Sequence, residues 1–416
     1  MPTVVQKYGG TSVADSRRIR AVADRVLAAK RAGNDVVVVV SAMGDTTDEL
    51  TAMAMEITPI PNPRELDLLL TAGERIAMSL LAIAINAEGF AAASYTGSQA
   101  GIITDTAHGK AKIIDIRPGR ILESLQQGNV VIVAGFQGVS TAHDVTTLGR
   151  GGSDTTAVAL AGALGADACE IYTDVDGVYT ADPRVVADAR KLALLSYDEM
   201  LELAAAGAKV LQLRSVEYAR RHGVRLHVRS SFTDDSGTWI VEEEERVEQA
   251  LISGVACDVD EVKMTIEQVP DRPGVAAEIF RAVADEGVHV DMIVQNSSRE
   301  GEGRTDVSFT VPKADLPRAA ALIERLTEKV GAAGHTVDDG IAKVSLVGAG
   351  MKSNFGVVAD MFEALASEGI NIEMISMSTI RISCVVRAEA ADRAVRAVHA
   401  KFDLGGDRAG DAEEVG

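Results

Sequence analysis

The first part of the chain alternates between short apolar runs and stretches in which apolar residues recur at helical spacing. Ile19, Val22 and Val26 follow the period of an amphipathic helix. Four apolar runs are typical of strands that are covered on both faces: Val4–Lys7, Val36–Val40, Val130–Ala134 and Glu170–Thr173. Strands that alternate with helices predict an α/β domain, with a mostly parallel sheet sandwiched between helices.

The second part of the chain contains an internal repeat. Glu242–Glu245 is an acidic run of the kind found in solvent-exposed linkers. Beyond it, Arg272–Ile293 is similar to Asn354–Ile375, and Asp306–Val311 and Arg381–Val386 supply a further strand in each copy. The order of strands and helices in each copy is βαββαβ, which predicts two small ferredoxin-like modules.

We therefore divide the chain into an N-terminal domain at residues 1–245, a first module at 246–336 and a second module at 337–416 that ends in a flexible tail. Small modules built on open sheets leave faces and edges that must be covered by each other or by another subunit. An oligomer is expected.

Composition and charge exclude several classes of function. A net charge of −20 and a pI near 4.8, with no run of Lys or Arg, argue against a nucleic-acid partner. The scattered cysteines Cys169, Cys257 and Cys384 do not form a disulfide framework. Because the N-terminus lacks a signal-peptide core and Val36–Val40 is too short to span a membrane, we expect a cytoplasmic protein without membrane contact.

Candidate chemistry begins after the first predicted strand. The chain has no P-loop and no Rossmann or protein-kinase signature, so a nucleotide would need another phosphate cradle. Lys7, Tyr8, Gly9 and Gly10 offer one, because a lysine followed by glycines leaves backbone N–H groups free at the start of a helix. Taken alone, such a segment is more often a simple glycine turn with a surface lysine.

Two further polar clusters follow buried stretches. Ser41, Asp45 and Thr47 come after the second strand, at the carboxyl edge where α/β sheets bind ligands. Thr71–Arg75 opens a helix and contains Glu74, a carboxylate suited to an ammonium group. Ordinary N-capping and a solvated Glu–Arg pair explain either cluster equally well.

The most specific cluster is Thr146–Thr156. Arg150 stands among glycines that include Gly151, and it precedes Ser153 and Asp154, which we expect to cap the next helix. A guanidinium beside free amides at a helix start forms an anion site, whereas a purely structural turn has no need of the arginine.

Tyr172–Arg184 follows another strand and combines carboxylates, hydroxyls, an aromatic ring and an arginine. Its Asp-x-Asp-Gly pattern is similar to a calcium loop, but no glutamate closes a twelve-residue loop and no helix precedes it. A nucleotide pocket fits these residue types better.

In order and spacing, these motifs resemble those of the aspartokinases, and the C-terminal repeat is similar to the paired ACT modules of that family. The resemblance covers nearly the whole chain. It implies transfer of a phosphoryl group from ATP, with Mg²⁺, to the side-chain carboxylate of L-aspartate. A carboxylate is already an ionised nucleophile, so that catalysis reduces to positioning and charge neutralisation, and the metal is expected to arrive with ATP.

The resemblance also implies roles for individual residues. The catalytic set would be Lys7, Gly9, Gly10, Arg150 and Asp154. The aspartate site would consist of Ser41, Asp45, Thr47, Glu74, Arg150, Gly151 and Ser153. The nucleotide site would consist of Lys7, Tyr8, Gly9, Gly10, Ser41, Thr173, Asp174, Tyr179, Asp182, Arg184, Lys209 and Val210. A regulatory site that binds threonine, lysine or both would use Asp271, Gly274, Val275, Ala276, Gln295, Asn296, Asn371 and Ile372.

Alternatives remain open. Kinases of the same fold act on glutamate, acetylglutamate or carbamate, but Glu74 and Arg150 favour a free α-amino acid and the repeat favours aspartate. A non-catalytic amino-acid sensor would be expected to lack Lys7 or Asp154, and both are present. The partner in an oligomer would be a second copy of the chain or a shorter chain that contains only the ACT modules.

Overall fold

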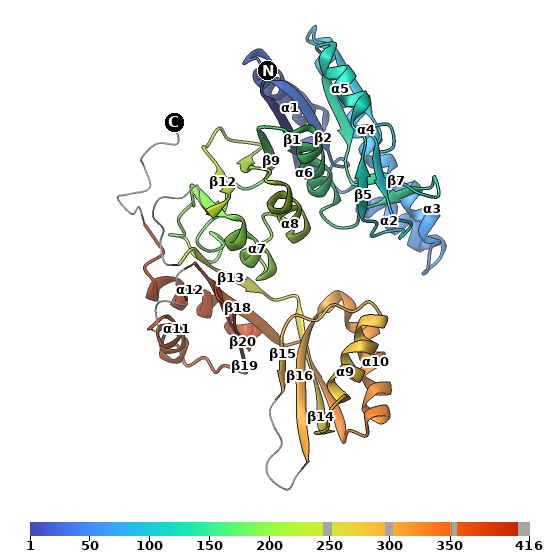
Figure 1. Cartoon of the computed structure of the whole chain (residues 1–416). Coiled ribbons are helices and arrows are strands. Elements are labelled where there is room, and N and C mark those ends of the chain that lie inside the picture. The colour runs from blue at the N-terminus through green and yellow to red at the C-terminus, as the bar shows by residue number, and fades with distance from the viewer. Residues whose placement is uncertain (244–251, 296–302, 350, 352–355, 407–416) are drawn as a thin grey trace.

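A computed structural model describes residues 1–243, 252–295, 303–349, 351 and 356–406. Glu244 and Glu245 of the acidic linker, Asn296 and the expected C-terminal tail lie outside the described residues. Figure 1 shows an N-terminal α/β domain above two smaller modules, with the second module next to α7 and the first module beside it.

A large sheet forms the centre of the N-terminal domain. Its strands are β1 (Thr3–Tyr8), β2 (Asp35–Val40), β3 (Ala92–Tyr95), β6 (Val130–Ala134), β9 (Ala168–Thr173), β10 (Leu194–Ser196), β11 (Leu226–Ser230) and β12 (Thr238–Val241). The order is β10-β12-β11-β9-β1-β2-β6-β3, and every neighbouring pair is parallel except β11 and β12. The predicted mostly parallel sheet is confirmed, and the four apolar runs form its central strands.

Helices cover both faces of this sheet. They are α1 (Ser16–Arg31), α4 (Ala72–Ala87), α5 (Gly119–Gln126), α6 (Gly152–Leu164), α7 (Tyr197–Ala205) and α8 (Leu213–His222). Away from this sheet, α3 (Pro63–Leu70) packs against the strand Val145–Thr147 and α2 (Thr46–Ile57) packs against α3. Val36, Val38 and Val40 pack into a core cluster with α1 and α4, whereas Val37 and Val39 pack into another with α6 and α8. Because both faces are buried, β2 is apolar at every position from Val36 to Val40 rather than at every second one.

A second, smaller sheet carries part of the polar sequence motifs. It consists of β5 (Ile113–Ile116), β4 (Ile102–Thr104), β7 (Gln137–Ser140) and β8 (Val145–Thr147), in that order. The chain leaves β8 directly into the turn that contains Arg150 and then enters α6.

The helical stretch Pro63–Ala87 is the one part of the described chain that is long and apolar enough to cross a membrane, by length and composition only. Half of its most apolar window is buried inside the protein. Leu81 and Ile85 lie in the core cluster beneath the large sheet, as expected for the core helix of a globular domain.

The two C-terminal modules each contain a four-stranded antiparallel sheet with two helices. The first has β14 (Glu261–Pro270), α9 (Val275–Asp285), β15 (Ile293–Gln295), β16 (Arg304–Pro312), α10 (Leu316–Val330) and β17 (Gly334–Asp338), with the sheet order β15-β16-β14-β17. The second has β13 (Gly254–Asp258), β18 (Ile341–Val347), α11 (Gly356–Ser367), β19 (Met374–Met377), β20 (Arg381–Arg387) and α12 (Ala391–Lys401), with the order β13-β18-β20-β19.

The sheets divide the chain differently from the sequence pattern at two places. The division at 246–336 put β13 with the first module, but β13 pairs with β18 and completes the sheet of the second, with Val255 opposite Leu346. Likewise β17, which straddles the predicted boundary at 336, belongs wholly to the first sheet. The first module is therefore inserted between two strands of the second, and a pairing over such a distance leaves no local signal.

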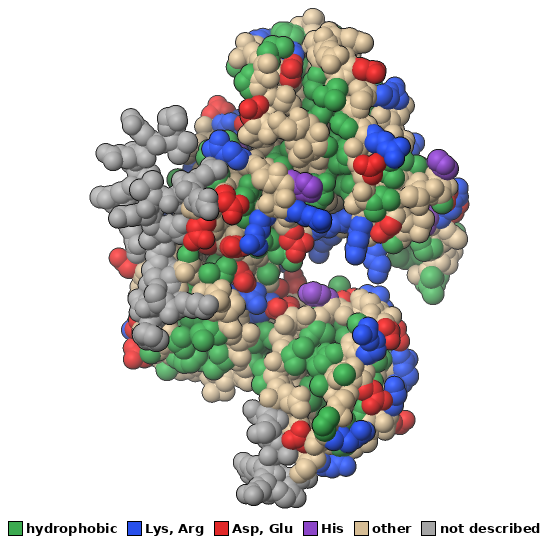
Figure 2. Space-filling view, in the orientation of Figure 1, with side chains coloured by type: hydrophobic (Ala, Val, Ile, Leu, Met, Phe, Trp, Pro, Cys, Tyr) green, Lys and Arg blue, Asp and Glu red, His purple; other side chains and the backbone are tan. Residues whose placement is uncertain are grey.

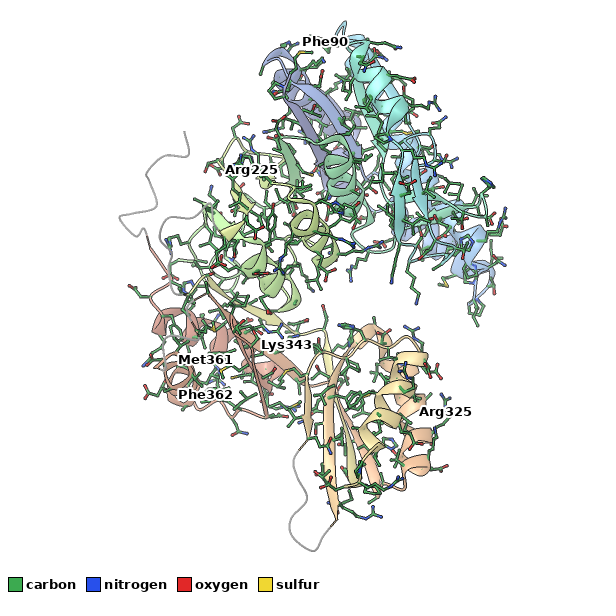
Figure 3. The ribbon with its side chains drawn as sticks, in the orientation of Figure 1. Phe90, Arg225, Arg325, Lys343, Met361 and Phe362 are labelled. Atoms are coloured by element: carbon green, nitrogen blue, oxygen red, sulfur yellow. The ribbon has the colours of Figure 1, made fainter. Side chains whose placement is uncertain are left out.

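Lys343 lies where the N-terminal domain meets both modules (Figure 3). Its Nζ is 2.5 Å from Asp291 and 3.3 Å from Glu261, both of the first module, and 3.5 Å from the carbonyl oxygen of Ala205 in α7. Burial lowers the pKa of Lys343, but the two carboxylates outweigh this and the pKa is raised. The charged ammonium therefore links three parts of the chain.

Candidate active site

The carboxyl ends of four neighbouring strands meet at one edge of the large sheet. Tyr8 pairs with Val40 on one side and with Tyr172 on the other, and Val40 pairs with Ala134. The loops that follow β1, β2, β6 and β9 therefore emerge side by side, which is where open α/β sheets bind ligands. Three of these four loops carry a polar motif found in the sequence.

Lys7 and Asp154 form an ion pair at this edge. The Lys7 Nζ lies 2.6 Å from the Asp154 carboxylate, and the side chains are only 12% and 11% exposed. A Cβ atom at Gly9 would lie 3.6 Å from the same Nζ, so the ammonium sits against the glycine turn. The motif at Lys7–Gly10 and the motif at Thr146–Thr156 are thereby brought together.

The start of α6 differs from the prediction that Ser153 and Asp154 cap it. The N-cap is Gly151, in the left-handed conformation with φ 70°, and no side chain bonds to the helix end. Ser153 and Asp154 instead lie in the first turn and are nearly buried. The prediction is wrong because the N-cap position is occupied by a glycine, which has no side chain to bond to the helix end, and the N–H of Gly152 bonds instead to the carbonyl oxygen of Gly149 at 2.9 Å.

The loops after β1 and β2 are in direct contact. A Cβ atom at Gly10 would lie 2.9 Å from the carbonyl oxygens of both Ala42 and Gly44, and the backbone N–H of Gly44 donates to the Gly10 oxygen at 3.0 Å. Only glycine allows this approach without a shift of backbone atoms. Ser41, whose N–H donates to the Tyr8 oxygen at 3.1 Å, begins the same loop.

Glu74 is a buried carboxylate beside these loops. Its side chain projects from the first turn of α4, the residue is 2% exposed, and Oε1 accepts a hydrogen bond from the Ala42 N–H at 3.1 Å. Oε2 is buried and has no hydrogen-bond partner among the described residues. Burial raises the pKa of Glu74 to about 7, which the bond from Ala42 only partly offsets. A cation placed at Oε2 would satisfy it.

Asp45 and Thr47 lie farther along the loop that contains Ser41. Asp45 is exposed at the N-cap position of α2 and makes no side-chain capping bond there. Thr47 is half-buried within the first turn of that helix.

Arg150 and Lys209 face the first module. Arg150 is exposed at the turn before α6, and Lys209 forms an ion pair with Asp260 at 2.7 Å. The bond from Lys209 lowers the pKa of Asp260, and the charge of Arg150 adds to this. Figure 2 shows Lys and Arg side chains gathered where the N-terminal domain faces the first module. No described contact joins Lys209 to the other predicted nucleotide residues, and Val210 packs against the domain core.

The segment after β9 exposes Asp174 and residues 182–184, whereas Val178, Thr180 and Ala181 are buried. Thr173 donates to Asp174 at 3.1 Å, and Arg184 forms an ion pair with Asp182 at 2.6 Å, which lowers the pKa of that carboxyl. Tyr179 is half-buried and forms an isolated antiparallel bridge with Lys191. The structure thus presents carboxylates, hydroxyls and a ring on one loop, next to the edge that holds Lys7.

Known proteins are similar to this chain over nearly its whole length. The amino acid kinase family matches residues 2–230, and the ACT domain matches 267–326 and 344–402. The chain is 58% identical over 410 residues to the aspartokinase of Mycobacterium tuberculosis strain H37Rv, which covers 98% of this chain and 97% of the relative. The chain belongs to the aspartokinase family. It is thus a phosphotransferase with a carboxyl group as acceptor, which confirms the resemblance seen in the sequence.

Other aspartokinases are also similar to this chain in sequence and structure. The enzyme of Corynebacterium glutamicum strain ATCC 13032 is 56% identical over 410 residues, which covers 98% of this chain and 97% of that one. Among solved structures, aspartokinase III of E. coli in complex with aspartate and ADP is 27% identical, with a TM-score of 0.83 over 96% of this chain and 99% of that one. The same E. coli enzyme in complex with lysine and aspartate has a TM-score of 0.74.

Two residues of this aspartokinase that the sequence did not single out support the loop of Arg150. Asp67, on α3, is 1% exposed, accepts from the Thr147 hydroxyl at 2.5 Å and pairs with His108 at 2.7 Å. Arg214, on α8, donates to the carbonyl oxygen of Leu148 at 2.9 Å. Asp67 could have been recognised from the sequence, because it is an acidic residue within the apolar run of α3. Arg214 could not, because an arginine on an amphipathic helix is ordinary.

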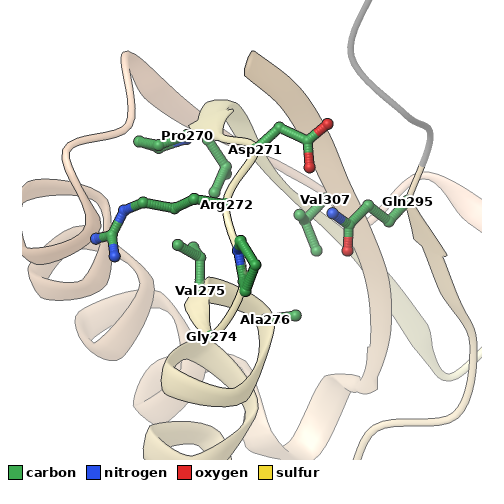
Figure 4. A pocket seen from close by; sticks show the side chains of 10 residues that line it. Pro270, Asp271, Arg272, Gly274, Val275, Ala276, Gln295 and Val307 are labelled. Carbon is green, nitrogen blue, oxygen red and sulfur yellow. The ribbon is translucent and has the colours of Figure 1, made fainter. Parts of the chain in front are cut away.

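The ACT repeat contains a pocket at the predicted regulatory turn (Figure 4). It has a volume of about 370 Å³ and is lined by Val269, Pro270, Asp271, Arg272, Pro273, Gly274, Val275, Ala276, Gln295 and Val307. Asp271 and Gln295 lie on one side of the turn and Arg272 points to the other. In the described part of the chain, Asn371 and Ile372 are not among the lining residues, and Asn296 is not described.

Proposed function

We propose that this aspartokinase transfers the γ-phosphoryl group of ATP to the side-chain carboxylate of L-aspartate at the edge where β1, β2, β6 and β9 end. The observation that carries this proposal is that a cation suited to phosphate, Lys7, and a carboxylate suited to an ammonium group, Glu74, lie beside the same two contacting loops. Lys7 lies against the glycine turn, and the loop that contacts Gly10 also holds Glu74, whose second oxygen has no described partner. The E. coli relative with bound aspartate and ADP supports this assignment.

The phosphoryl group would be held by Lys7 and by the backbone around Gly9 and Gly10. A loose transition state spreads negative charge over the transferring oxygens, and fixed cations and amides stabilise it most when they need not reorganise. Asp154 keeps the Lys7 ammonium in place before the substrate arrives. No general base is needed, because the aspartate side chain, with an ordinary pKa near 3.9, is already ionised at neutral pH.

Aspartate would be held at both ends of its backbone. Glu74 would receive the α-ammonium and Arg150 the α-carboxylate, with Ser41, Asp45, Thr47, Gly151 and Ser153 lining the site. Ion pairs with a planar guanidinium are directional, so that the two contacts fix which carboxylate faces the phosphoryl group. Arg150 is exposed on a glycine-flanked turn, so it can close over the substrate.

The nucleotide would lie along the segment after β9. Thr173, Asp174, Tyr179, Asp182, Arg184, Lys209 and Val210 are the proposed contacts, together with Lys7, Tyr8 and Ser41. The described residues contain no group of three or more His, Cys, Asp or Glu side chains that could hold a metal. We therefore assign Mg²⁺ to the phosphate oxygens of ATP, where it would neutralise charge during transfer.

Regulation is proposed at the pocket of the first ACT module. Asp271 would receive the ammonium of threonine or lysine, and backbone N–H groups at the start of α9 would receive its carboxylate. Gln295 faces the same pocket, and residues around Asn371 and Ile372 would complete the site from another copy. The E. coli relative with bound lysine supports an amino-acid effector.

An oligomer and a cytoplasmic location remain proposals. The edge strands β15 and β19 expose large apolar side chains, with Ile293 52% and Met377 64% exposed. Edge strands with apolar residues are natural pairing surfaces, either for a second copy or for a shorter ACT-only chain. Mass photometry of the purified chain would test the assembly.

The first test is ATP- and Mg²⁺-dependent hydroxamate formation with aspartate, glutamate and acetylglutamate in parallel, with and without threonine and lysine. Trapping of an acyl phosphate from aspartate alone is the expected result. Turnover of acetylglutamate or glutamate instead would assign another substrate, and no turnover without effectors would favour an amino-acid sensor.

A further inference from the structure

The nucleotide loop of the N-terminal domain is built into the second ACT module. Thr180 follows Tyr179 and precedes Asp182, both proposed nucleotide contacts, yet it is fully buried. Its carbonyl oxygen accepts from the N–H of Val255 in β13 at 2.7 Å. A Cβ atom at Gly254 would lie 2.7 Å from the same oxygen, so the strand and the loop are in the closest contact that backbones allow.

The hydrophobic core of the second module extends into this loop. Ala181 and Val186 are each 4% exposed and belong to the same core cluster as Leu346 of β18 and Val398 of α12. No other core cluster of the described chain includes Ala181 or Val186. The loop therefore takes its packing on both sides of Asp182 from the second module.

Two side chains of α12 bond directly to the loop: Arg396 donates to the carbonyl oxygen of Val185 at 3.4 Å, and His399 bonds to Thr180. His399 is 1% exposed, and its Nε2 lies 2.9 Å from the Thr180 hydroxyl, although the two residues are far apart in sequence. The hydroxyl also accepts from the Arg190 N–H at 2.9 Å and donates its only proton to the Leu404 oxygen at 3.1 Å. With that proton engaged, Nε2 must carry a hydrogen and donate it to Thr180.

All three bonding positions of the Thr180 hydroxyl are then used. Burial lowers the pKa of His399, so the ring is neutral at neutral pH, with its hydrogen on Nε2. Loss of the imidazole would leave a buried acceptor without its donor, which costs more than the bond itself contributes.

We propose that His399 is a positioning residue for ATP: through Thr180 it holds the loop of Tyr179, Asp182 and Arg184 in its nucleotide-binding form. This proposal rests on the nucleotide site proposed above. It makes the C-terminal helix of the second module part of the ATP site, while the aspartate site, which lies on other loops, does not depend on it.

The test is steady-state kinetics of the full chain with ATP and aspartate varied separately. His399→Leu should raise the KM for ATP roughly fivefold, the effect of one neutral hydrogen bond, with the KM for aspartate unchanged. Thr180→Val, which also removes the bonds to Arg190 and Leu404, should raise the KM for ATP at least as much, again with the KM for aspartate unchanged. His399→Gln, which can place an amide N–H near the position of Nε2, and Thr180→Ser should restore the wild-type value. The double variant should be no worse than Thr180→Val alone, because that change already removes the bond from His399.

Two controls separate the possible outcomes. His335→Leu removes a matched contact, from His335 to the Thr327 hydroxyl at 3.2 Å in the first module, and should leave the KM for ATP unchanged. Arg184→Ala tests the nucleotide site itself. Thermal melting checks that the single variants His399→Leu and Thr180→Val are folded. If Arg184→Ala raises the KM for ATP and neither folded single variant does, the role of His399 is overturned and the nucleotide site stands. If Arg184→Ala has no effect, the nucleotide site is wrong and the inference falls with it.

Discussion

Glu74→Gln is the sharpest test of the aspartate site. Glu74 is nearly fully buried, with one oxygen bonded to Ala42 and the other without a described partner. Glutamine keeps the size and the bond to Ala42 but removes the charge. A hydrogen bond to a charged group contributes about 1.5–3 kcal/mol, so the KM for aspartate should rise roughly 10- to 100-fold while the KM for ATP stays within about twofold.

The same residue predicts how stability depends on pH. The pKa of Glu74 is raised from 4.5 to about 7 in the folded state. Between these values the folded state keeps a proton that the unfolded state has released, so the free energy of unfolding falls as pH rises. The shift corresponds to about 3 kcal/mol of destabilisation above pH 7, and Glu74→Gln should remove it. Bound aspartate should also reduce the slope, because its ammonium stabilises the carboxylate.

Urea unfolding of the wild type and the variant from about pH 5 to about pH 8.5, with and without aspartate, measures this slope, and the hydroxamate assay measures KM. Glu199→Gln is the matched control, since Glu199 is equally buried but bonds to Ser196 and Ser253. That change should leave the KM for aspartate unchanged. An aspartate KM within threefold of wild type for Glu74→Gln, together with an unchanged pH slope, would refute the role of Glu74.

Three other changes test the phosphoryl site, the loop of Arg150 and the regulatory pocket. Lys7→Met should lower kcat by roughly 10²- to 10³-fold with little change in the KM for aspartate, because it removes a donor to the transferring group; an unchanged kcat would exclude that role. Asp67→Asn weakens the support of Thr147 and should raise the KM for aspartate roughly tenfold through the Arg150 loop, with ATP binding by calorimetry unaffected. Asp271→Asn should raise the effector concentration needed for half-inhibition at least tenfold with uninhibited kcat unchanged; equal loss of activity without effector would point to a structural role.

Local patterns were sufficient for the framework of the fold. The unbroken valines of β2 indicated a strand buried on both faces, and the spacing of Ile19, Val22 and Val26 indicated α1. The repeat indicated the two modules, since each copy encodes a strand, turn and helix of its own. These features depend on neighbours in the sequence, so the sequence alone determines them.

Contacts between distant segments needed the tertiary structure. The sequence names Lys7 and Asp154 separately, but only the meeting of β1 and α6 makes them an ion pair. Likewise, only the packing of α4 against the loop after β2 buries Glu74 and raises its pKa. The pairing of β13 with β18 around the inserted first module, and the bond from His399 to Thr180, join segments that are far apart in the sequence. Such contacts depend on the fold as a whole, because burial and charge act through space and not along the sequence.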